Sequence, residues 1–249
     1  MHQRLGGEHR GRRQSLERYR EKGLEGPQKN AKYAAMVTSV DEAVGRVLDT
    51  LEELDLTRST LVVFTSDNGG LIGPTDNSPL RSGKGYAYEG GLRVPWIFHW
   101  PGTLSPTRTT TPITSVDLVP TSCRALGLDV PKPTLDGVDL FGALAGRMEI
   151  ATRPLYWHFP HYRGRDVVPY SVVRDGRYKL IRRAVDGTDR PQFELFDLQN
   201  DPAETKNLAE MEPERVEALA AQLAARLTEV GAVQVKWRSD DRTPREGDR

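Results

Sequence analysis

The longest regular pattern of apolar residues lies between Tyr33 and Leu54 and has the spacing of an α-helix. Apolar side chains recur there every three or four positions, and charged residues occupy the positions between them. The members of this apolar stripe are Met36, Val37, Val40, Val44, Val47, Leu48, Leu51 and Leu54. We therefore predict a helix over this stretch that covers one face of a sheet.

A short apolar run, Leu61–Thr65, follows this helix after a polar turn and leads into Ser66-Asp67-Asn68-Gly69-Gly70. Its length and β-branched residues predict a buried strand of a parallel sheet, so that helix and strand form half of a βαβ unit. Ligands of open α/β sheets bind at the carboxyl ends of the strands. The carboxylate of Asp67 and the amide oxygen of Asn68 suit Ca²⁺ or Mg²⁺ better than zinc. A simple turn explains the same residues, and these ten positions leave both interpretations open.

The C-terminal part of the chain predicts an antiparallel sheet and a helix. Tyr170–Arg174 and Arg177–Ile181 alternate as a hairpin would, with Asp175-Gly176 as the turn between them. Phe193–Leu198 adds a third strand, and an apolar stripe predicts a helix over Pro213–Val230.

A shorter helix is predicted over residues 115–126. Val116, Val119, Cys123 and Leu126 share one face of it, and Gly127 ends it. We expect Cys123 to be buried and inert. Because it is the chain's single cysteine, an intrachain disulfide is excluded.

Composition excludes some classes of function. Lys plus Arg and Asp plus Glu number 35 each, so no net field attracts nucleic acid. We find no apolar stretch of the ~18–20 residues that a membrane span needs. The first residues lack an apolar core, so no signal peptide is visible.

Two unusual motifs follow the strand at 61–65. Asn77–Gly85 is a glycine-rich loop that carries Lys84, and Tyr88–Pro95 reads Tyr-Glu-Gly-Gly-Leu-Arg-Val-Pro. We expect Glu89 to brace this loop, with Arg93 as its partner.

Taken in order with Ser66–Gly70 and with Trp100-Pro101-Gly102, these motifs resemble the type I, formylglycine-dependent sulfatases. The resemblance runs from about Asn30 to Asn207 and implies an α/β fold, the second half of an alkaline-phosphatase-like sulfatase fold with a small antiparallel C-terminal subdomain. The domains expected are a polar lead-in at 1–29, the catalytic α/β part at 30–150, the subdomain at 151–235 and a disordered tail at 236–249.

The resemblance also implies roles for single residues. Asp67 and Asn68 match the ligands of a divalent cation, usually Ca²⁺, and Lys84 matches a cation that contacts the sulfate. His2 lies near the place of an active-site histidine but lacks the Thr-Pro context that follows it in the family. His158 and His161 lie among aromatic residues and either line a sugar-binding rim or pack within the subdomain.

The family's first half carries the formylglycine precursor and further metal ligands, and this chain shows none of those motifs. Leu104–Arg108 copies the frame of the nucleophile motif with leucine at the nucleophile, and Cys123 lacks the motif's proline and arginine. We therefore expect residues 1–249 alone to bind Ca²⁺ weakly and to hydrolyse no sulfate ester.

The partners implied are a sulfated small molecule or glycan and the missing N-terminal half, with no nucleic acid and no membrane span. Two other functions stay open. A relative in the same superfamily would act on phosphate or phosphonate esters, although Asn68 favours the sulfatase. A non-catalytic remnant would bind a sulfated glycan. The family is often periplasmic or secreted, and this sequence leaves the localisation open.

Overall fold

The computed structural model describes most of the chain, namely residues 14–23, 28–129, 136–164, 166–185 and 188–233. Within these residues no helix has the length and apolar character that crossing a membrane requires.

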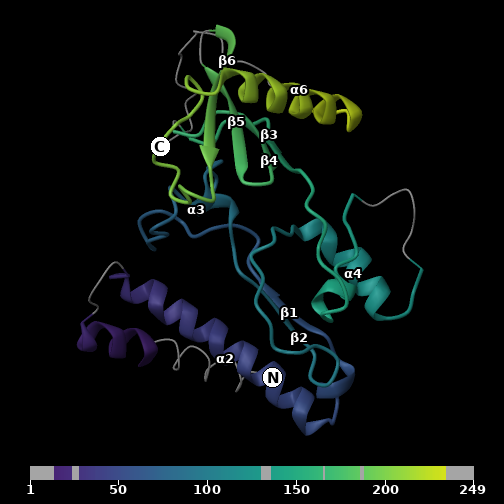
Figure 1. Cartoon of the computed structure of the whole chain (residues 1–249). Coiled ribbons are helices and arrows are strands. Elements are labelled where there is room, and N and C mark those ends of the chain that lie inside the picture. The colour runs from purple at the N-terminus through teal and green to yellow at the C-terminus, as the bar shows by residue number, and fades with distance from the viewer. Residues whose placement is uncertain (1–13, 24–27, 130–135, 165, 186–187, 234–249) are drawn as a thin grey trace. The chain divides into compact units, whose positions relative to one another are not determined.

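The chain divides into two compact units (Figure 1). Unit 1 consists of Met1–Asn77 and Val94–Ile150, and unit 2 consists of Ser78–Arg93 and Ala151–Arg249. The segment that carries Lys84 therefore belongs to the unit that contains the C-terminal sheet.

In unit 1 the predicted long helix is present as α2, Ala31–Glu53. The side chain of Asn30 caps its first turn by accepting a hydrogen bond from the Tyr33 amide at 3.0 Å. The expectation that its apolar stripe covers a sheet is wrong for the residues described here. Met36 is 65% exposed, and Val40 and Val47 are exposed as well. The 3.6-residue period identifies an apolar face but does not say what covers it.

The predicted strand at 61–65 is present as β1, Val62–Thr65, but its expected parallel pairing and burial are wrong. β1 pairs antiparallel with β2, Trp96–His99, in a two-stranded sheet. Phe64 is 42% exposed, so this face of the strand is uncovered among the described residues. A short apolar run does not specify its partner's direction, which explains the error.

Unit 1 also contains a helix over residues 14–22. Its other elements are short, namely η1 Thr57–Ser59, η2 Ser115–Asp117, α4 Leu118–Ala125 and α5 Phe141–Leu144. Gly127, with a φ of +67°, ends α4 as predicted. Cys123 is only half-buried, and Val119 and Leu126 on the same face are exposed, so the prediction of a buried thiol is wrong.

Unit 2 is organised around a four-stranded antiparallel sheet in the order β3-β4-β5-β6. The strands are β3 Leu155–Phe159, β4 Tyr170–Asp175, β5 Tyr178–Val185 and β6 Thr188–Asp197. The predicted hairpin, third strand and helix are confirmed, the helix being α6, Pro213–Glu229. The hairpin turn is displaced by one residue, because Asp175 still pairs with Tyr178 and Gly176-Arg177 form the turn.

Both faces of this sheet are covered by other segments. Because side chains alternate along each strand, neighbouring residues contribute to two separate apolar clusters. On one face, Leu180 and Leu195 pack with Leu219 and Leu223 of α6, which lies across the sheet (Figure 1). On the other face, Val172, Ile181 and Phe196 pack with Ala87 and Tyr88. The Lys84-bearing segment thus contributes directly to the core of unit 2.

Truncating this core tests the packing of α6. We expect Leu223→Ala to lower the free energy of unfolding by about 2–5 kcal/mol, since Leu223 is buried and its removal leaves a cavity. Glu217→Ala, at an exposed position of the same helix, should change it by about 0.5 kcal/mol or less. Urea unfolding followed by circular dichroism measures both, and equal effects would contradict this packing.

Candidate functional site

In unit 1 the chain leaves β1 through Asp67 and Asn68, as the sequence analysis expected. Asp67 is exposed and Asn68 is half-buried. The Thr65 hydroxyl donates to the Pro95 carbonyl at 3.0 Å, and the Ser66 hydroxyl donates to the Asn68 carbonyl at 2.8 Å. These bonds fix the backbone on both sides of the two side chains.

Asn77 closes the loop that begins with these residues. Its side chain accepts from the Gly70 amide at 3.1 Å and donates to the Gly70 carbonyl at 2.9 Å. A Cβ at Gly70 would lie 2.4 Å from Thr75 Cγ2, so only glycine fits this close approach. These contacts fix the loop that carries Asp67 and Asn68, and both the turn and the ligand interpretation of the Asp-Asn-Gly-Gly motif stay open.

The donor chemistry of this loop fits a hard cation. Asp67 offers a carboxylate and Asn68 an amide oxygen, the ligand types that Ca²⁺ and Mg²⁺ prefer. Across the described ranges, no three His, Cys, Asp or Glu side chains gather as a metal cluster. The type of ligand fits, but two side chains are fewer than the six to eight oxygens of a Ca²⁺ site.

In unit 2, Lys84 lies exposed on the loop that precedes α3, Glu89–Leu92. The Gly90 amide donates to the Arg81 carbonyl at 2.9 Å. A Cβ at Gly90 would lie 2.4 Å from that same carbonyl oxygen, and one at Gly91 would lie 2.3 Å from the Tyr86 carbonyl oxygen. The glycine pair thus lets the short helix pack against the backbone of the Lys84 loop.

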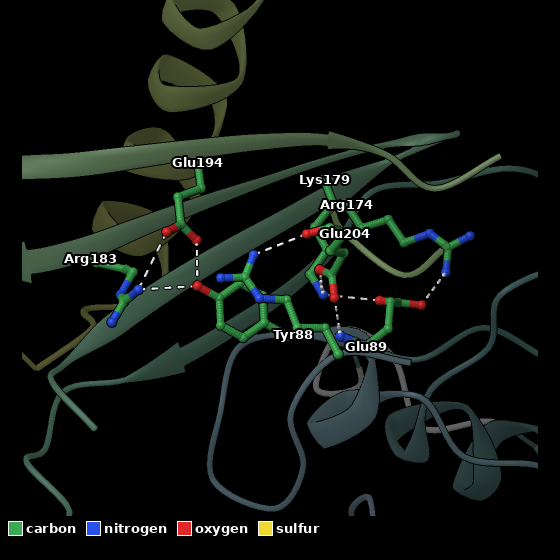
Figure 2. A network of polar contacts seen from close by, with 8 residues as sticks. Tyr88, Glu89, Arg174, Lys179, Arg183, Glu194 and Glu204 are labelled. Carbon is green, nitrogen blue, oxygen red and sulfur yellow. Dashed lines mark hydrogen bonds and ion pairs between the residues drawn. The ribbon is translucent and has the colours of Figure 1, made fainter. Parts of the chain in front are cut away.

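Glu89 anchors this packed segment to the sheet through a buried charge cluster. Lys179 Nζ lies 2.9 Å from Glu89 Oε1 and 2.8 Å from Glu204 Oε1 (Figure 2). The Glu89 amide also donates to Glu204 Oε2 at 2.6 Å. All three residues are buried, Glu89 being 3% exposed and the other two 0%. An ammonium is removed from water only where it gains such partners.

Two arginines extend the charge cluster. Arg174 Nη1 lies 3.9 Å from Glu89 Oε2, and Arg81 Nη1 donates to the Glu204 carbonyl at 3.0 Å. Burial raises the pKa of Glu204 above its ordinary value; Lys179 opposes this rise, and the charge of Glu89 adds to it. Glu204 also has a φ of +54°, which places its side chain and carbonyl in a tight turn.

A second polar group lies beside the cluster on the same face of the sheet. The Tyr88 hydroxyl donates to Glu194 Oε2 at 2.8 Å, and Arg183 Nη1 lies 3.1 Å from that hydroxyl (Figure 2). Burial, with the hydrogen bond and charge of Glu194, raises the pKa of Tyr88 to about 12. Arg81 stacks on the Tyr88 ring, its Cζ 3.8 Å from the centroid. Tyr88 is therefore a neutral anchor at physiological pH.

The expected brace is confirmed, but its partner is not the expected one. Glu89 pairs with Lys179 and Arg174 of the sheet, so the prediction that it pairs with Arg93 is wrong. A buried carboxylate needs cationic partners that are buried with it. Arg93 is exposed, so it does not serve as the partner of Glu89.

The predicted site residues are divided between the two units. Asp67 and Asn68 are neighbours in unit 1, whereas Lys84, His158 and His161 belong to unit 2. His2 lies outside the described residues.

The two rim candidates differ in their contacts. His158 Nδ1 lies 2.9 Å from Ser171 Oγ, and its Nε2 lies 2.8 Å from the Val233 carbonyl oxygen. Because a carbonyl only accepts, Nε2 donates there, and both ring nitrogens are engaged. His161 is exposed and sets its ring edge-on to Phe159 at 5.5 Å. Hydrogen bonds within the unit thus hold the ring of His158, and the rim role stays a prediction for both histidines.

Lys179 and Glu204 were not predicted from the sequence as residues of the site. Glu204 lies in the motif Asp-Pro-Ala-Glu-Thr-Lys-Asn-Leu. Its carboxylate can accept a hydrogen bond from a backbone amide, as it does from Glu89, so the motif could have pointed to it. No local sequence signal indicates that Lys179 is buried. The alternation of side chains along β5 predicts which face of the sheet Lys179 lies on, but not that this face is covered there.

Two family models match this chain. The model described as "Sulfatase" matches residues 5–128, and the one described as "N-sulphoglucosamine sulphohydrolase, C-terminal" matches residues 82–233. The chain belongs to the sulfatase family. The resemblance to the sulfatases drawn from the motifs is therefore confirmed. By family the chain belongs with the sulfuric ester hydrolases, and its fold is alkaline-phosphatase-like.

Relatives of this sulfatase-family chain include a "Sulfatase" of Formosa agariphila, 38% identical over 212 residues, and human arylsulfatase A, 34% identical over 205 residues. The matches cover 77% and 72% of this chain but 38% and 40% of those proteins. The crystal structure of Ps i-CgsB in complex with k-i-k-neocarrahexaose superposes with a TM-score of 0.70 at 27% identity, covering 90% of this chain and 48% of that one. The chain thus spans less than half the length of these proteins.

Removing the central ammonium tests the charge cluster. We expect Lys179→Met to lower the free energy of unfolding by about 3–5 kcal/mol, because Glu89 and Glu204 would be left buried without their cation. Lys206→Met, at an exposed position of the same unit, is the matched control and should change little. Urea unfolding of both variants measures the difference, and a Lys179→Met variant as stable as the control would contradict the assignment.

The raised pKa of Glu204 predicts a pH dependence with a definite sign. A carboxyl with a raised pKa contributes stability that is present below its ordinary value of 4.5 and lost as the pH rises through the folded value. The advantage of wild type over Glu204→Gln in unfolding free energy should therefore shrink as the pH rises above 4.5. Urea unfolding across this range measures it, and an advantage that grows with pH would contradict the direction.

Proposed function

We propose that this chain supplies the C-terminal part of the catalytic domain of a sulfate ester hydrolase that acts on a sulfated sugar or an aryl sulfate. The observation that carries the proposal is the loop after β1, which presents Asp67 and Asn68 from a backbone fixed by Asn77. Asp and Asn are also common turn residues, so the loop by itself fits either interpretation. Membership of the sulfatase family gives that pair a chemical purpose.

In this proposal Asp67 and Asn68 hold Ca²⁺ or another divalent cation. Such a cation supplies positive charge beside the sulfate oxygens when it is bound. Both side chains are on one loop, so they offer their oxygens together without a change in the fold of unit 1. The exposed carboxylate of Asp67 contributes the negative charge that retains the cation.

Lys84 is the residue proposed to contact the sulfate. Its side chain is exposed, while the backbone around it is fixed by packing on α3 and by the buried charge cluster. Sulfuryl transfer places charge on the oxygens around sulfur, and a cation whose backbone is held in place stabilises that charge with little reorganisation. Family membership supports this role for a lysine at this point in the motif order.

The substrate class is proposed from the relatives and from the surface of unit 2. Human arylsulfatase A is named for aryl sulfates, and the structure of Ps i-CgsB holds k-i-k-neocarrahexaose. His161, which is exposed beside Phe159, offers an imidazole ring against which a sugar ring would pack. A sulfated sugar would use both this surface and Lys84.

The 249 residues on their own are proposed to be inactive. The described residues offer two protein ligands to the cation, and the sequence shows no nucleophile motif. We expect Ca²⁺ binding with a Kd of about 0.1–1 mM or weaker. Turnover of an aryl sulfate by this chain alone would overturn this part of the proposal.

Isothermal titration with Ca²⁺ tests the proposed ligands. Asp67→Ala should remove the binding heat, because the carboxylate supplies the charge that holds the cation. Asp49→Ala removes an exposed carboxylate from α2 of the same unit and should leave the heat unchanged. Equal loss in both variants would indicate general attraction of cations by acidic residues and would contradict a site at Asp67.

A further inference from the structure

The backbone of Lys84 is held by a residue that no motif identified. Arg163 Nη1 donates to the Lys84 carbonyl at 2.6 Å. This is a charge-assisted hydrogen bond to the main chain of the very residue whose ammonium is proposed to meet the sulfate. The two residues are 79 positions apart in sequence and belong to the same unit.

Gly85 makes room for this contact. It has a φ of +93°, and a Cβ built there would lie 2.0 Å from Arg163 Nη1 and 3.1 Å from its Cζ. Any other residue would therefore displace the guanidinium from the Lys84 carbonyl. The glycine after Lys84 is needed for the approach of Arg163 as well as for its own backbone angle.

Arg163 is itself tied to the core. Its amide donates to the Val167 carbonyl at 3.0 Å, and the Val167 amide donates back to the Arg163 carbonyl at 3.3 Å. Val167 is buried in the same apolar cluster as Tyr88 and Ile181. The contact with Lys84 thus joins the exposed loop to the fixed interior of unit 2 at a point separate from Glu89.

We propose that Arg163 is a positioning residue for Lys84. With the carbonyl of Lys84 held by Arg163 and the following helix held by Glu89, the lysine backbone is anchored at its own carbonyl and again at α3. Because the backbone is fixed, the exposed ammonium moves only through the rotations of its own side chain. Less conformational entropy is therefore lost when it binds an anion. This inference rests on the proposed sulfate-contacting role of Lys84.

The Lys84–Gly85 peptide bond is a trypsin site, so the contact can be measured directly. Cleavage requires the loop to open, and its rate reports the population of the open form. We expect Arg163→Ala to raise the rate of cleavage at Lys84–Gly85 about tenfold, because a hydrogen bond from a charged group is lost. Cleavage at Lys206–Asn207, in the same unit, should keep its wild-type rate. Arg163→Lys, which can still donate to the carbonyl, should restore part of the protection.

Two outcomes of the protease experiment would overturn the proposal. An unchanged rate at Lys84–Gly85 would show that Arg163 does not hold the loop. An equal rise at both sites would show that Arg163 only stabilises the unit as a whole.

A second pair of variants perturbs the same contact from the other side. Gly85→Ala should mimic Arg163→Ala, because the added methyl group displaces the guanidinium. Gly73→Ala is the matched control, since Gly73 has a similar φ of +98° and nothing within 4 Å of the added carbon. If Gly73→Ala, which carries the same backbone strain, leaves cleavage at Lys84–Gly85 unchanged while Gly85→Ala speeds it, the contact is supported. Equal effects of the two variants would contradict it.

The ammonium of Lys84 gives a readout that general stability does not move. Lysines labelled with ¹³C-methyl groups are observed by NMR, and Lys84→Arg assigns the Lys84 signal. We expect inorganic sulfate to shift this signal in wild type and to shift it less in Arg163→Ala. An identical titration in both proteins would overturn the positioning role. If sulfate leaves the wild-type signal unmoved while the protease result holds, Arg163 still holds the Lys84 loop and the sulfate-contacting role of Lys84 fails.

Discussion

The burial of the Lys179 ammonium constrains the whole of unit 2. A charge without access to water must be matched by opposite charges in contact with it, and here Glu89 and Glu204 provide them. These three residues come from the Lys84-bearing segment, from a strand of the sheet and from the turn after the last strand. One electrostatic requirement therefore fixes three distant parts of the chain against each other.

Several elements could be predicted from the sequence because their signals are local. The period of 3.6 in α2 and α6 and the period of 2 in the β4–β5 hairpin are properties of short stretches. The pairing of β1 and the exposure of the α2 stripe could not, since both depend on which other segment lies alongside. The sequence pattern identifies an apolar face, but it does not identify the segment that packs against that face.

The candidate site divides in the same way. Asp67, Asn68 and Lys84 stand in motifs and could be named from the sequence, and so could the bracing role of Glu89. The partners of Glu89 could not, because the nearest cation in sequence was Arg93 and the real partner, Lys179, is 90 residues away. The residues proposed to contact a ligand lie in short sequence motifs, whereas the buried partner Lys179 is determined by tertiary packing and has no local signal.

The span of this charge cluster bears on the order in which the protein forms during synthesis. Glu89 leaves the ribosome 115 residues before Glu204. Until Lys179 and Glu204 have followed, the Glu89 carboxylate has no counter-charge to be buried with and stays in water. Contacts of such long sequence separation form late and slowly. The loop that carries Lys84 therefore acquires its shape only when translation of the unit is almost complete.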